Sequence, residues 1–149
     1  MKLKAKGITY DAAKSRALGP GGKVYNGTFM GEKATFMVFF NAKSRIVFGV
    51  SVELSYSSVE LARVPFTNIA GQLVKKYPKA VYGANKDSNG DTNGLTFSIP
   101  NEADTEKIGV IIQTLNNSQS PLKDDCTIGL MYTDVENFKK SEALNNEDL

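Results

Sequence analysis

Histidine and tryptophan are absent from this chain of 149 residues, and cysteine occurs once. Without histidine the chain can form neither a Ser-His-Asp nor a Cys-His nucleophilic triad, and it has no histidine-rich zinc or iron site. A lone cysteine excludes an internal disulfide. We therefore expect a protein that is not an enzyme, and the sequence assigns no catalytic, cofactor-binding or metal-binding residue and no cofactor.

Strong charge of one sign and long apolar runs are also lacking. Lys and Arg number 18 against 16 Asp and Glu, a net charge of +2. This balance does not predict nucleic acid as a partner, because nucleic-acid binders concentrate basic residues on one face. The longest apolar run, 36–40, is far shorter than the roughly 20 residues that span a bilayer. We expect no transmembrane segment.

The first seven residues contain three lysines but no apolar segment, so they are not an intact signal peptide. Two interpretations stay open. The protein is exported, to the periplasm or the cell surface, if a signal peptide was removed; otherwise it is cytoplasmic. One cysteine fits both compartments.

The length predicts a single domain. We place this domain at residues 1–140 and expect a polar, flexible tail at 141–149, where acidic residues and asparagines predominate.

Apolar residues alternate with other residues along two neighbouring segments, 34–40 and 46–54, which the polar loop 41–45 separates. Period-two alternation on both sides of a short loop predicts a β-hairpin. Further alternation predicts strands at 81–84, 95–99, 108–115 and 126–132.

Two helices are expected. Residues 65–77 carry one apolar stripe with helical spacing, from Phe66 to Tyr77. Pro65 suits the first turn, so we prefer this start to an earlier one capped by Ser57 with Glu60. Residues 10–18 predict a short helix that Thr9 caps, with Tyr10 and Leu18 in its buried stripe. A terminal helix could begin at Asp134.

These elements predict an α+β protein. We expect a mainly antiparallel sheet with the long helix, about 65–77, and the short helix, about 10–18, packed on one face. The opposite face of the sheet would then be open.

Two loops resemble known binding motifs only superficially. The segment 19–23 lacks the spacing and the hydroxyl of a phosphate loop, and we interpret it as a turn. The segment 87–94 alternates oxygen-bearing side chains as a calcium loop does, but no glutamate closes it at the required position. A connecting turn is the preferred interpretation.

The remaining reactive side chains are also weak candidates. Glu53, Asp134 and Glu136 flank strand ends, but nothing in the sequence sets two of them at the spacing of a glycosidase pair. Cys126 falls in the apolar row of a strand, which indicates a buried, inert thiol. An exposed aromatic patch is another possibility, on the residues Tyr25, Phe29, Phe39 and Tyr56.

Three local patterns resemble a family of small uncharacterised α+β proteins exported by gut bacteria. They are the segment 27–31 (GTFMG), the helix pattern from Phe66 to Lys76-Tyr77, and the late strand from Leu130 to Asn137. The sheets of that family are similar to β-lactamase-inhibitor-like and peptidase-propeptide-like modules. The resemblance implies export and protein binding without catalysis. The chain departs from the pattern in its shorter first helix and in Pro78, where the family has glycine.

Three functions remain open. The first is a non-catalytic exported domain that binds a protein, peptide or glycan through the open sheet face. The second is a small-molecule carrier, or an enzyme without histidine, with a cavity between sheet and helix. The third is a structural or assembly subunit. The sequence specifies neither the ligand nor the oligomeric state.

Overall fold

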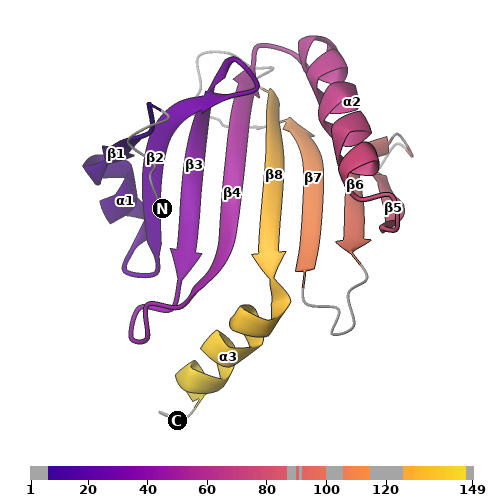
Figure 1. The fold of residues 1–149 in the computed structure, drawn as a ribbon. Helices are drawn as coiled ribbons and strands as arrows, with labels where there is room; N and C mark the ends of the chain where they lie inside the picture. Colours follow the sequence, from indigo (N-terminus) through magenta and orange to yellow (C-terminus); the bar gives the residue numbers. More distant parts are fainter. Residues whose placement is uncertain (1–6, 87–89, 91, 100–105, 115–125, 147–149) are drawn as a thin grey trace.

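The computed structural model describes residues 7–86, 90, 92–99, 106–114 and 126–146, which form an eight-stranded sheet and three helices (Figure 1). The elements follow one another as β1 (Thr9–Asp11), α1 (Ala12–Leu18), β2 (Gly22–Phe29), β3 (Glu32–Phe40), β4 (Val47–Tyr56), α2 (Val59–Lys76), β5 (Val81–Lys86), β6 (Thr92–Ile99), β7 (Glu106–Thr114), β8 (Cys126–Asp134) and α3 (Val135–Asn146). The predicted α+β class is confirmed.

The sheet is antiparallel throughout, with the strand order β1-β2-β3-β4-β8-β7-β6-β5. Each half of the chain therefore builds a meander that runs from one sheet edge to the centre, where β4 pairs with β8. The strands predicted from alternation all overlap observed strands. A two-residue turn, which we did not predict, joins β2 to β3.

The register sets one apolar face of the sheet against α2. Phe36 pairs with Val52, and Val52 pairs with Leu130, so the three side chains share a face. The buried cluster on this side joins strand residues to α2 residues: Ala34, Val52, Leu54, Ala62, Ile69, Cys126 and Ile128. α2 contacts β4, β8 and β7. In Figure 1 no described helix lies in front of β2 and β3.

The predicted start of the long helix at Pro65 is wrong. The helix begins at Val59, because Ser58 has an extended backbone and its side chain accepts a hydrogen bond from the Leu61 N–H at 3.2 Å. Pro65 lies inside the helix, where it supplies no N–H for the Leu61 carbonyl. The helical turn before Pro65 is stable despite this missing hydrogen bond, because Ala62 within it is fully buried against the sheet.

The short helix also differs from the prediction. It begins at Ala12, and Asp11 rather than Thr9 caps it, accepting from the Lys14 N–H at 3.0 Å. Its expected apolar stripe is not buried: Tyr10 lies in β1 and is exposed, and Ser15 is the buried helix residue. The Ser15 hydroxyl accepts from the Val24 N–H at 2.8 Å. α1 therefore lies along β2, at the sheet edge and away from α2 (Figure 1).

The terminal helix begins as predicted but runs further. Asp134 caps α3 by accepting from the Asn137 N–H at 2.9 Å. The helix continues to Asn146, so residues 141–146, which we assigned to the tail, are helical. Ser141 is buried, and Phe138 packs edge-on against Phe48 of β4 with ring centroids 5.4 Å apart. No helix in the described part of the chain is both long and apolar enough to cross a membrane.

Candidate functional site

An apolar groove of about 640 Å³ lies between α2 and the tip of the β2–β3 hairpin. Its apolar residues come from three parts of the fold: Phe29 and Met30 of the hairpin, Ile69 and Leu73 of α2, and Leu130 and Tyr132 of β8. The floor exists because α2 covers β8 only in part, which leaves Leu130 and Tyr132 half-buried. The groove can hold an apolar group against the sheet.

The hairpin wall of the groove is held by a strained turn. Phe29 pairs with Glu32, so Met30 and Gly31 form a two-residue turn, with φ of 52° and 82°. Positive φ at both positions is the geometry of a type I′ turn, which favours Asn-Gly. Methionine at the first position costs about 1 kcal/mol relative to an ordinary backbone conformation. The turn nevertheless presents the 47% exposed thioether side chain of Met30 at the groove.

A smaller hollow of about 200 Å³ continues the groove toward the N-terminal half of α2. It shares Phe29, Met30 and Ile69 with the larger hollow. Its polar pair consists of Tyr56 and Glu32, where the phenol donates to Oε2 of the carboxylate at 2.5 Å. Burial, followed by the hydrogen bond to Glu32, raises the pKa of Tyr56 well above its ordinary value.

The other end of the groove is basic. Lys75 and Lys76, in the last turn of α2, line the larger hollow together with Gln72 and Tyr77. The ammonium group of Lys76 lies 5.3 Å from the centroid of the Tyr77 ring. The groove therefore has a carboxylate at one end, two ammonium groups at the other, and apolar side chains between them.

The opposite face of the sheet has a hollow of similar volume, about 670 Å³, but a polar lining. Asn26, Thr35 and Glu53 are among its residues. This is the face that we expected to be open and to bind a partner. Its lining lacks the large apolar side chains that give the α2 groove its floor, so the α2 groove is the stronger candidate site.

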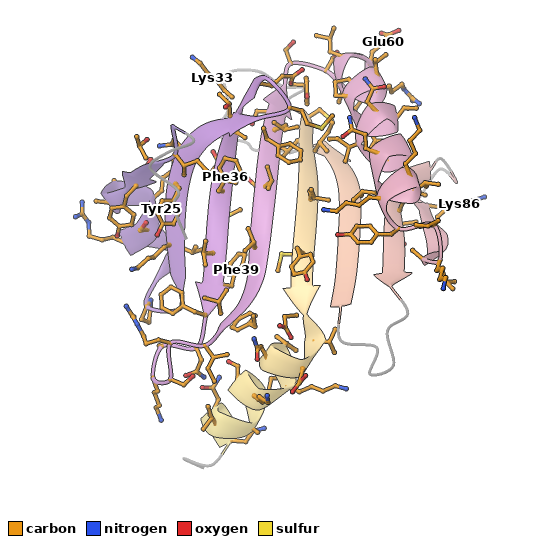
Figure 2. The ribbon with its side chains drawn as sticks, viewed as in Figure 1. Tyr25, Lys33, Phe36, Phe39, Glu60 and Lys86 are labelled. Carbon is orange, nitrogen blue, oxygen red and sulfur yellow. The ribbon has the colours of Figure 1, made fainter. Side chains whose placement is uncertain are left out.

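The four aromatic residues considered from the sequence do not form one patch. Tyr25 pairs with Phe36, so both side chains lie on the α2 face of the sheet. Phe29 lies four residues after Tyr25 in β2, and Tyr56 lies four residues after Val52 in β4, so both lie on the same face. Phe39 pairs with Gly49 and lies on the other face. Figure 2 shows Tyr25, Phe36 and Phe39 on β2 and β3. Only Phe29 and Tyr56 of the four line the groove or its smaller hollow.

The three candidate carboxylates are not gathered at a site. Glu53 pairs with Gly129, which is five residues and thus about 17 Å along β8 from Asp134. That separation exceeds the range of about 5 to 9 Å that a glycosidase pair needs. Asp134 caps α3, and Glu136 forms an ion pair with Lys140 at 2.8 Å.

The remaining candidates contribute no site among the described residues. Cys126 is fully buried, as predicted, and burial raises the pKa of its thiol, which keeps it protonated. In the calcium-like segment, Asp87, Ser88, Asn89 and Asp91 lie outside the described residues. Within the described ranges, no group of three His, Cys, Asp or Glu residues could hold a metal ion.

A cavity between sheet and helix was one of the alternatives from the sequence, but the residues that line this groove were not predicted, because its walls come from segments about 40 residues apart that periodicity cannot bring together. One signal was present. Met30-Gly31 follows the period-two residues of β2, and a two-residue turn with glycine predicts a tight hairpin.

Comparison of the chain with protein-family models, curated proteins and solved structures finds no match.

Proposed function

We propose that this protein is an exported, non-catalytic binding domain, and that it holds an apolar part of its partner in the groove between α2 and the β2–β3 hairpin. The observation that carries the proposal is the half-buried floor of Leu130 and Tyr132, which α2 leaves uncovered. Apolar surface in a concave site is the usual basis of ligand binding. The absence of histidine and the resemblance to exported binding modules support the same role.

The proposal is tested with the fluorescent probe 1-anilinonaphthalene-8-sulfonate, an apolar anion. We expect the folded protein to bind it and the substitution Met30→Asp to weaken binding, because a carboxylate then faces the groove. Met30 is exposed at a hairpin tip, so the variant keeps its fold, which its thermal unfolding curve checks. Val81→Asp is the matched control, since Val81 is an exposed apolar residue on β5, outside the groove. Equal binding by both variants would contradict the proposed site.

Export is tested separately in the source cells. We expect antibodies against the folded domain to detect the protein in the periplasmic or cell-surface fraction. Detection in the cytoplasm alone would overturn this part of the proposal and leave the groove unaffected.

A further inference from the structure

The α2 wall of the groove carries two amide side chains. Asn68 lines the smaller hollow and Gln72 lines the larger one. Both residues are exposed, and neither side chain makes a hydrogen bond within the described part of the chain. An amide side chain both donates and accepts hydrogen bonds. The wall therefore offers paired donors and acceptors directly above the apolar floor.

The spacing of these amides matches an extended polypeptide. Asn68 and Gln72 are four residues apart, so they project from the same side of α2 about 6 Å apart along the helix. In an extended chain, backbone N–H and C=O groups that face one side recur every second residue, about 6.6 Å apart. An alkyl chain has no such polar repeat. The wall thus fits the edge of an extended peptide.

The ends of the groove add charge selectivity. The α2 residues that line the two hollows run from Val64 to Lys76, a rise of about 18 Å along the helix, which matches about five residues of extended chain. At one end Lys75 and Lys76 favour an acidic side chain. At the other, the Glu32 carboxylate favours a basic one. A segment with charges of opposite sign at its two ends complements the groove.

We propose that the groove binds an extended peptide segment of about five residues. Its apolar side chains lie on Phe29, Leu73 and Leu130, and its backbone pairs with Asn68 and Gln72. An acidic residue lies beside Lys75 and Lys76. This inference rests on the proposed function, because it specifies the partner that the same groove would hold.

The probe is the capped peptide acetyl-Lys-Leu-Ser-Leu-Glu-amide, titrated into the full chain by calorimetry at low ionic strength. Two N-methylated forms accompany it, one methylated at the serine nitrogen and one at both leucine nitrogens. Only one side of an extended chain can face α2. We therefore expect one methylated form to bind much more weakly and the other to retain most of the affinity.

Protein variants test each contact. Asn68→Ala with Gln72→Ala should weaken binding of the peptide about tenfold, since two hydrogen bonds are lost. Lys75→Gln with Lys76→Gln should weaken it about threefold to tenfold. The same lysine variant should bind a peptide ending in glutamine as the wild type does. Lys139→Gln with Lys140→Gln, on α3 outside the groove, is the matched control.

Two outcomes would overturn the inference while leaving the binding function intact. In the first, the protein binds the fluorescent anion but not the peptide. In the second, the fatty acid dodecanoate displaces the anion and the peptide does not, which would identify a small amphipathic acid as the ligand class. Failure of the fluorescent anion itself to bind would instead contradict the proposed function.

Discussion

Asn41 and Ser141 are separated by 100 positions in the chain, and the side-chain amide of Asn41 donates to Ser141 Oγ at 3.1 Å and to its carbonyl at 3.3 Å. Both residues are buried. The side-chain oxygen of Asn41, Oδ1, also accepts from the N–H groups of Lys43 and Ser44, at 3.0 and 2.9 Å. One side chain thus shapes the β3–β4 loop and attaches α3 to it.

Removing this connection should destabilise the protein. We expect Asn41→Ala to lower the free energy of unfolding by about 2–3 kcal/mol, because buried donors and acceptors lose their partners. Urea denaturation measures the change. Asn145→Ala is the control, since it removes only the outer contact to Asn41, 3.2 Å long, and should cost less than about 1 kcal/mol. Similar losses in both variants would contradict a central role for Asn41.

The Tyr56–Glu32 pair predicts a loss of stability in alkali. The pKa of Tyr56 is raised in the folded protein, so the folded state holds its proton more tightly than the unfolded state does. The resulting stabilisation is complete below the ordinary tyrosine pKa of 10.0 and is lost as pH rises through the higher pKa of the folded state. Urea denaturation at several pH values from 9 upward should show this decline, and Tyr56→Phe should reduce it. An unchanged decline in the variant would show that Tyr56 is not its source.

Replacing Met30 should increase the stability of the protein and weaken binding in the groove. Asparagine tolerates positive φ better than methionine, so Met30→Asn should raise the free energy of unfolding by up to about 1 kcal/mol. It should also weaken binding of 1-anilinonaphthalene-8-sulfonate, because the thioether leaves the groove. Chemical denaturation and fluorescence titration on one preparation measure both effects. A variant that is more stable and binds equally well would show that Met30 does not contribute to the site.

Pro65 predicts a stabilising substitution inside α2. Pro65→Ala restores an N–H for the Leu61 carbonyl and removes the steric conflict of the ring with the preceding turn. We expect the free energy of unfolding to rise by about 1–3 kcal/mol. Guanidinium denaturation gives the value. A decrease would mean that packing of the proline ring, which is half-buried beside the smaller hollow, outweighs the helix bond.

The strands could be predicted from the sequence because one face of the sheet is buried and the period-two pattern records that burial. Val52 and Leu54 are buried, whereas Glu53 between them faces the other side. Helix ends were less predictable. A proline usually marks a helix start, yet the cap at Ser58 and the burial of Ala62 outweigh the cost of Pro65.

Tertiary contacts explain the remaining differences between the structure expected from the sequence and the observed one. Ser15 is buried because its hydroxyl bonds to the backbone of β2, whereas the apolar Leu18 stays 39% exposed. Residues 141–146 are polar and suggested a tail, but Ser141 meets Asn41. The groove likewise depends on contacts between segments that are far apart in the sequence. Met30 and Leu73 line one hollow only because α2 lies beside the hairpin tip.

The most direct test of the binding site is a map of amide chemical shifts on the ¹⁵N-labelled protein during titration with 1-anilinonaphthalene-8-sulfonate. The account predicts shifts that cluster at Met30, Asn68, Gln72 and Lys76, along the two walls of the groove. Shifts centred on Thr35 and Glu53 would place the site on the opposite face of the sheet and contradict the account.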